Sequence, residues 1–149
     1  MATTSAERDE RIAEAAGRLR LAIVRTARRM RQEAGGGLSP TLAAALASID
    51  RLGPLTPSEL ADIERVKRPT ATRIAAALER DGLIVRATDP SDGRASLLSV
   101  SPAGRALMKR LRKRKNAYLS KRLRSMGEEE IEVLEQAAGV LEQMLEEPS

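Results

Sequence analysis

The 149-residue sequence predicts a mainly α-helical protein with one small β-hairpin. Three observations support this prediction. Apolar residues recur every three or four positions through most of the chain, which is the spacing of helices that pack by one face. Hydroxyl-proline pairs at 39–40, 56–57 and 101–102 mark helix starts, because the hydroxyl caps the first turn and proline suits the first helical position. The segment 84–100 alone changes to a strand-like pattern around a turn.

The first two helices are bounded by glycine and proline. Residues 7–34 carry an apolar stripe, and the run 35–37 of three glycines ends this helix. Ser39 then caps an Ala/Leu-rich helix that starts at Pro40 and stops near Gly53. The sequence therefore predicts a long N-terminal helix followed by a second, shorter one.

A third, short helix has the clearest start in the sequence. Thr56 and Glu59 have the spacing of a capping box, in which each side chain bonds the other residue's amide. Leu55 and Leu60 occupy the two positions of a hydrophobic staple, and the helix is expected to end around Val66.

The fourth helix is expected over 69–81, with Gly82 as its C-cap. One face is apolar, and a second set of residues points elsewhere. Because two short helices joined by a tight connection form a helix-turn-helix, 56–81 is a candidate for that motif. The apolar face consists of Ala71, Ile74, Ala75 and Leu78, and the second set of Thr70, Thr72, Arg73, Ala76 and Arg80.

A hairpin follows this pair of helices. Residues 84–88 and 95–100 read as strands, with Leu98 and Val100 on one face, and 89–94 reads as the turn. Two helices and a hairpin in this order predict a winged helix-turn-helix, which we assign to 38–100.

The C-terminal region is expected to contain two more helices. The first starts at Ser101-Pro102 and continues to about Arg124; Ser125 and Glu128 offer a second capping box before the last helix. That helix has two apolar rows, more than one neighbour requires, so we expect 1–37 and 101–149 to form a two-fold dimerisation region. An intramolecular bundle of the first and last helices is the alternative. The rows are Ile131, Leu134, Ala138, Leu141 and Leu145, and Val133, Ala137, Val140 and Met144.

Charge is strongly segregated along the chain, although the net charge is only +5. Residues 101–126 carry ten basic side chains and no acid, and residues 127–149 carry eight Glu and no base. Two interpretations remain open: the two stretches are adjacent helices whose polar faces attract each other, or part of the basic surface meets nucleic-acid phosphates.

Composition excludes several functions. The chain has no Cys and no His, which removes thiol chemistry, the commonest general base and the commonest metal ligand. We therefore expect no enzyme activity, cofactor or metal. Tyr118 is the only aromatic residue, so a small-molecule pocket should have an aliphatic lining. No apolar run has the length of a membrane span and no signal peptide is recognisable, which predicts a cytoplasmic protein.

The start of the fourth helix has the chemistry of a DNA-reading element. The major groove of B-DNA admits one α-helix, which needs a packed face and an opposite face of hydrogen-bonding side chains. An ordinary solvated helix start is the alternative. The candidate DNA-binding residues here are Lys67, Arg68, Thr70, Thr72 and Arg73.

Arg94 lies at the tip of the hairpin turn, where a long side chain can project outward. A narrow minor groove attracts an inserted arginine, and the nearby carboxylates of Asp89 and Asp92 can orient the guanidinium. The alternative is that both aspartates only shape the turn and are neutralised by Arg94.

The hairpin resembles the wing of MarR-type (multiple antibiotic resistance regulator) transcription factors. The run 83–94, Leu-Ile-Val-Arg-Ala-Thr-Asp-Pro-Ser-Asp-Gly-Arg, is similar to that family's wing signature. Residues 56–61 and 69–73 are similar to its two motif helices, and 100–104 to its strand-to-helix junction. The resemblance extends over nearly the whole chain.

The resemblance implies a homodimeric repressor that binds a pseudo-palindromic site in double-stranded DNA. Thr70, Thr72 and Arg73 would face the major groove or its flanking phosphates, and Arg94 would enter the minor groove, oriented by Asp92 and Asp89. Arg86, in the same motif, is a further DNA-binding candidate.

Many members of the family release DNA when a small anion binds, and Arg25, Arg28 and Arg29 could hold one here. The Cys of peroxide-sensing members and the His of zinc-sensing members are absent.

Three other functions are alternatives. A winged-helix module that binds protein instead of DNA would fit the zero net charge of 56–100. A membrane-surface role for the basic stretch 105–124 lacks interfacial aromatic residues. An enzyme is the weakest candidate, because no nucleophilic constellation can be recognised.

Overall fold

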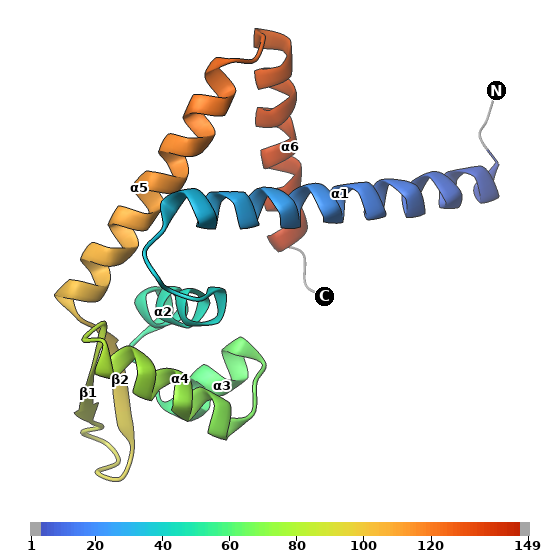
Figure 1. Cartoon of the computed structure of the whole chain (residues 1–149). Helices are drawn as coiled ribbons and strands as arrows, with labels where there is room; N and C mark the ends of the chain where they lie inside the picture. The colour runs from blue at the N-terminus through green and yellow to red at the C-terminus, as the bar shows by residue number, and fades with distance from the viewer. Residues whose placement is uncertain (1–3, 147–149) are drawn as a thin grey trace. The chain divides into compact units, whose positions relative to one another are not determined.

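A computed structural model describes residues 4–146 of the chain. The described residues form six helices and one two-stranded antiparallel sheet (Figure 1), in the order that the sequence predicts. The elements are α1 (Ser5–Ala34), α2 (Pro40–Leu52), α3 (Pro57–Glu64), α4 (Arg68–Arg80), β1 (Ile84–Thr88), β2 (Ser96–Val100), α5 (Pro102–Arg124) and α6 (Glu128–Glu146).

The chain divides into two compact units. One is continuous, Gly35–Lys113, and the other combines the described residues 4–34 with 114–146. This division falls within α5, whereas the sequence predicts a functional boundary at the start of that helix. Leu107 and Met108 pack against the core of the first unit, so the first turns of α5 belong to it.

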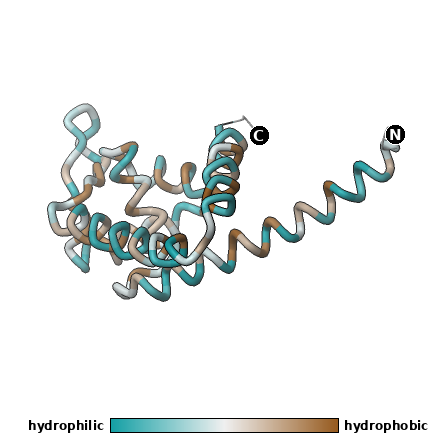
Figure 2. Tube along the Cα trace, turned by 90° about the horizontal axis from the view of Figure 1, so that it is seen from above, coloured by the Kyte–Doolittle hydropathy of each residue, from teal (hydrophilic) through white to brown (hydrophobic). Residues whose placement is uncertain are grey.

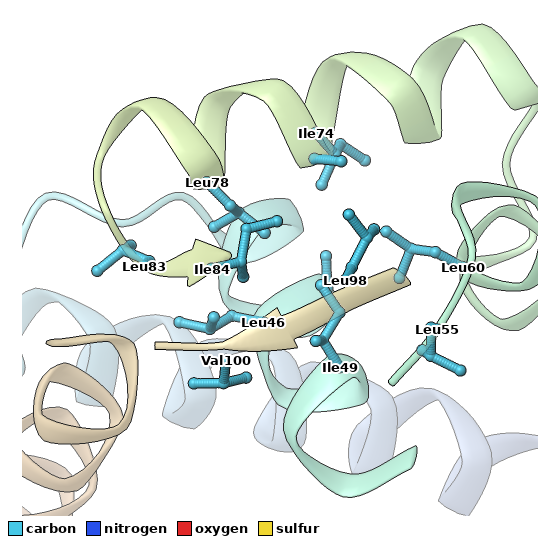
Figure 3. Close-up of a cluster of buried hydrophobic side chains, with 12 residues drawn as sticks. Leu46, Ile49, Leu55, Leu60, Ile74, Leu78, Leu83, Ile84, Leu98 and Val100 are labelled. Carbon is cyan, nitrogen blue, oxygen red and sulfur yellow. The ribbon is translucent and has the colours of Figure 1, made fainter. Parts of the chain in front are cut away.

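The core of the unit Gly35–Lys113 lies between α2, α3, α4 and the hairpin. In Figure 3, Leu46 and Ile49 of α2 lie opposite Ile74 and Leu78 of α4, and Leu98 of β2 joins the same cluster. The predicted inner face of α4 is confirmed, because all four of its apolar residues are buried. Burying a side chain as large as that of Ile74 or Leu78 stabilises the fold by about 1.5–3 kcal/mol relative to leaving it exposed. This burial fixes which face of α4 meets solvent.

The hairpin is joined to the rest of this unit through Leu98. Leu98 pairs with Arg86 across the sheet and also exchanges two backbone hydrogen bonds with Leu55, of 3.0 and 2.7 Å. Leu55 is also one of the two predicted staple residues, and both it and Leu60 are buried. The base of the wing is therefore held from the side of the α2–α3 connection, where the Gly53–Pro54 peptide bond is cis.

The corner from α4 to β1 is a complete Schellman motif. The Gly82 amide donates to Glu79 O and the Leu83 amide to Leu78 O, both at 2.9 Å. Gly82 has φ of +72°, a left-handed conformation that glycine adopts without a Cβ penalty. The Ser101 hydroxyl donates to the Gly82 carbonyl and the Ser101 amide to that of Leu83, so the start of α5 holds the same corner.

Three of the four helix starts argued from capping are confirmed, and one is wrong. The Ser101 hydroxyl accepts the Gly104 amide at 3.0 Å in the first turn of α5. Ser39 caps α2, and Thr56 forms the full capping box with Glu59 on α3. The box expected at Ser125 is absent, because this residue still belongs to the end of α5: its amide and hydroxyl both bond the Arg122 carbonyl. Gly127 precedes α6 instead, and the Glu130 carboxylate accepts its amide at 3.3 Å.

The apolar rows of α1 and α6 are largely uncovered by the rest of the chain. No residue of α6 is buried in the described structure, and Ala34 is the one buried residue of α1. Val133 and Val140 of α6 are 63% and 57% exposed. In Figure 2, hydrophobic stretches recur along α1 between hydrophilic ones. An intramolecular bundle of the first and last helices would bury these rows, and the described residues show no such burial.

Within residues 4–146, no helix is both long and apolar enough to cross a membrane.

Candidate functional site

The connection between α3 and α4 is a tight turn with a left-handed residue. Arg65 has φ of +53°, and the Val66 amide closes the turn by donating to Ala61 O at 3.0 Å. Just before it, the Glu64 carboxylate accepts a hydrogen bond from the hydroxyl of Ser48, which is buried in α2. This bond fixes the end of α3 to α2, and so fixes where α4 starts. This bond cannot be predicted from the sequence, because Ser48 carries no local signal of a partner sixteen residues away.

The first turn of α4 exposes both cations and backbone amides. Lys67 is the N-cap residue but makes no side-chain capping bond, and Pro69 follows in the first turn. Lys67, Arg68 and Arg73 are all exposed. The helix dipole adds a partial positive charge at this end, so the start of α4 attracts anionic groups.

The two threonines of the same turn have local partners. The Thr72 hydroxyl donates to Arg68 O at 3.0 Å, while Thr70 Oγ1 lies 3.5 Å from Arg73 Nη2. Thr72 is exposed and Thr70 is half-buried. The five candidate residues therefore lie between the N-cap and the second turn of α4. Four of them are exposed, and Thr70 is half-buried.

The wing turn is built by its two aspartates. The Asp89 carboxylate accepts from the Ser91 hydroxyl at 2.7 Å and from the Ser91 amide at 2.9 Å. These bonds hold the pKa of Asp89 below its ordinary value, and the bond from the Ser91 hydroxyl makes the largest contribution. Asp92 accepts from the backbone amide of Arg94 at 3.1 Å. Both carboxylates thus shape the backbone that carries Arg94.

The Arg94 side chain is exposed at the tip of the wing. No ion pair joins its guanidinium to Asp89 or Asp92 in the described part of the chain. The orienting role of the two aspartates therefore stays a prediction, while their role in the turn is present in the structure.

Arg86, on β1, contacts the C-terminal end of α4, whereas Lys67, Arg68 and Arg73 lie at the start of that helix. Its Nε donates to Glu79 Oε2 at 2.7 Å, and the two side chains are 33% and 45% exposed. The sequence does not reveal Glu79 as a partner, because the pair spans the corner between a helix and a strand. Arg86 thus differs from the other candidates in having an ion-pair partner.

The unit formed by the two ends of the chain contains a charged hollow of about 450 Å³. The Arg29 guanidinium lies 3.0 Å from Glu33, and Arg114 Nη1 donates to Ala34 O at 3.0 Å. Its wall differs from the aliphatic lining expected of a small-molecule pocket, because Tyr118 and charged side chains form most of it. Of the three N-terminal arginines proposed as anion ligands, one lines it. The lining residues are Arg29, Glu33, Arg114, Ala117, Tyr118, Lys121 and Arg122.

Comparisons with known proteins agree with the winged-helix geometry. The family model that describes the MarR family matches residues 38–96. An uncharacterized HTH-type transcriptional regulator of Mycobacterium bovis is 35% identical over 136 residues, covering 91% of this chain and 95% of the relative.

Solved structures extend this similarity to the fold. A crystal structure of a Pseudomonas aeruginosa protein described as a transcriptional regulator has a TM-score of 0.84 and 31% identity, covering 93% of this chain and 98% of that one. A variant of S. aureus MepR bound to an oligodeoxyribonucleotide has a TM-score of 0.68 at 18% identity, covering 89% and 98%. The winged helix, the family model and a relative matched over almost its full length together identify this chain as a member of the MarR family of HTH-type transcriptional regulators.

Proposed function

We propose that this chain is a homodimeric, sequence-specific regulator that binds a pseudo-palindromic site in double-stranded DNA, represses transcription and acts in the cytoplasm. The observation that carries the proposal is the pairing, in one compact unit, of a cationic α4 start with an arginine-tipped wing. We propose no catalytic role, because the sequence lacks both His and Cys and the family relatives are transcriptional regulators.

In this proposal α4 is the recognition helix. Its buried face points into the core, which leaves Thr70, Thr72 and Arg73 for base edges in the major groove or its flanking phosphates. Lys67 and Arg68, with the uncapped amides of the first turn, would bind backbone phosphate. An arginine that reaches a guanine edge with two hydrogen bonds contributes about 1–3 kcal/mol of base discrimination.

The wing would supply the second contact. Arg94 would enter the minor groove, where narrow A·T-rich segments concentrate negative potential. The bonds that Asp89 and Asp92 make to the turn support this role, because they order the backbone under Arg94 before DNA arrives. Less conformational entropy is then lost on binding.

A second copy of the chain would cover the apolar rows of α1 and α6. These rows are exposed on helices of 30 and 19 residues, and charged side chains lie between them. An isologous two-fold interface is the commonest way to bury such surfaces. Two winged units would then meet two DNA half-sites about 10–10.5 bp apart.

The charged hollow is the proposed effector site. Four cations against one carboxylate favour a ligand with at least two negative charges, and the ring of Tyr118 offers one aromatic surface. Citrate, a tricarboxylate probe, should release DNA from the wild type more strongly than from Lys121→Ala at matched ionic strength. Equal release from both proteins would remove the hollow from the proposal.

Selection of bound duplexes from a random DNA pool tests the proposed function directly. A palindromic consensus is expected, and affinity for it should fall steeply with added salt. Arg94→Ala should weaken binding while leaving the dimer and its melting temperature nearly unchanged. Arg51→Ala, which removes an equal charge from the exposed side of α2, is the matched control and should bind like the wild type.

Two results would contradict the proposal. Wild-type affinity in Arg94→Ala would remove the wing from the mechanism. No enrichment of any duplex would instead favour a winged-helix module that binds protein.

A further inference from the structure

The pair Glu79–Arg86 links the recognition helix to the wing. Glu79 is the penultimate residue of α4, and Arg86 is the central residue of β1. Two ion pairs are present among residues 4–146. One is Glu79–Arg86, and the other joins Arg29 to Glu33 within the single helix α1. Glu79–Arg86 is therefore the one that joins two different elements.

Arg86 is well placed to fix the direction of the wing. Side chains alternate along a strand, so Arg86 lies on the same face of β1 as Ile84, which is buried against the core next to Leu78 of α4 (Figure 3). On the partner strand, Leu98 lies directly opposite Arg86 and is fully buried. The base of the strand is thus rigid, and the guanidinium reaches from it to α4.

Beyond Arg86 the wing has no further side-chain bond to α4 in the described structure. The side-chain hydrogen bonds of Asp89, Ser91 and Asp92 all stay within the turn. The wing from Ala87 to the tip therefore depends on the ladder to β2 and on this one ion pair for its angle to α4.

The pair contributes little to stability, because both partners are one third to one half exposed. The same contact also neutralises Arg86 and occupies its Nε. We propose that Glu79 and Arg86 are a positioning pair, which sets the angle between the recognition helix and the wing, and that Arg86 acts through Glu79 without touching phosphate. This inference rests on the proposed DNA binding and reassigns Arg86 among its candidate residues.

One test follows the wing without DNA. The chain has no native Cys, so cysteines can be introduced for spin labels at Ala76, on the exposed side of α4, and at Gly93, where a Cβ meets nothing within 4 Å. Pulsed electron–electron double resonance on the full-length protein should give a narrow distribution of distances between the two spin labels. Glu79→Ala and Arg86→Ala should each widen it, and Arg51→Ala should not. An unchanged distribution in both variants would overturn the proposal even if the protein bound no DNA.

The second test uses DNA affinity and its salt dependence. Glu79→Ala and Arg86→Ala should each weaken binding to the selected duplex about tenfold. The double variant should bind no more weakly than either single variant, because each single change already removes the same interaction. The slope of log K against log salt should equal that of the wild type in all three. The conservative Glu79→Asp with Arg86→Lys should recover part of the affinity.

A direct phosphate contact would behave differently. Arg86→Ala would then lower the salt slope by about 0.9, while Glu79→Ala, by freeing the guanidinium, would leave affinity unchanged or raise it. That result would overturn the positioning role while leaving the proposed DNA-binding function intact. A wild type that binds no duplex would instead contradict the proposed function.

Discussion

At the scale of single residues, charged side chains in the winged unit act through bonds that their residue type alone does not reveal. Asp89 and Asp92 both occur in a turn motif, and both bind backbone amides of the turn in the structure. Glu64 and Glu79 are ordinary helical glutamates by sequence, yet each accepts a bond from another element. The role of each carboxylate is therefore set by its nearest donor.

The wing turn should depend on pH through Asp89. Its pKa is lowered in the folded protein, so the ionised carboxylate stabilises the turn above its ordinary pKa, and this contribution is lost as pH falls through the lowered value. Ser91→Ala removes the first cause of the shift and should raise the pKa of Asp89 toward its ordinary value. Carbon-13 NMR titration of the carboxyl group measures this. Ser99→Ala, on β2, should leave the pKa unchanged, and an unshifted titration in Ser91→Ala would contradict the assignment.

At the scale of elements, most helix boundaries were predictable because their signals are local. Ser39, Thr56 and Ser101 each precede proline and cap the next helix within three residues. The hairpin was predictable for the same reason. The start of α6 was not predictable, because Ser125 and Gly127 both suit a cap. The Ser125 hydroxyl instead bonds the Arg122 carbonyl at the end of α5.

This difference between two predicted capping boxes can be measured. Thr56→Ala removes the hydroxyl that accepts the Glu59 amide at 3.1 Å, and should lower the free energy of unfolding by about 1 kcal/mol. Ser125→Ala removes no capping bond of α6, and should change that energy by less than about 0.5 kcal/mol. Urea denaturation of the two variants provides the comparison. Equal losses in both would mean that Ser125 caps α6 in solution.

Polar contacts between different elements could not be predicted from sequence patterns. Ser48–Glu64, Glu79–Arg86 and the Arg114 bond to the Ala34 carbonyl span 16, 7 and 80 residues. Periodicity predicts which face of a helix is buried, as on α4, but it does not predict which polar side chain on another element will come within bonding distance. The DNA-binding candidates can be predicted from the sequence because they cluster in one motif. The partner of Arg86 and the charged hollow cannot, because they depend on how separate elements pack.

At the scale of the whole molecule, the segregated charges of α5 and α6 remain unmatched among residues 4–146. No ion pair in the described structure joins the glutamates of α6 to the cations of α5, so the attraction between neighbouring helices suggested by the sequence has no such contact to support it. The exposed apolar rows of α6 lie among those glutamates. Burial against a second copy is the arrangement that would use these rows, and it is also what recognition of two half-sites requires.

Breaking the proposed dimer should separate folding from DNA binding. Val133→Glu with Val140→Glu places charge on side chains that are 63% and 57% exposed in the single chain, so each chain should still fold, as circular dichroism can verify. Sedimentation velocity should then show a monomer. Affinity for the palindromic duplex should fall about 10²–10⁴-fold, because two half-sites are no longer bound by one linked particle, while affinity for an isolated half-site should stay the same. Gln136→Glu adds a similar charge to an exposed polar position of α6 and should remain dimeric. If the double variant sedimented like the wild type, these rows would not form the dimer interface, and the two winged units would have to be linked by another surface.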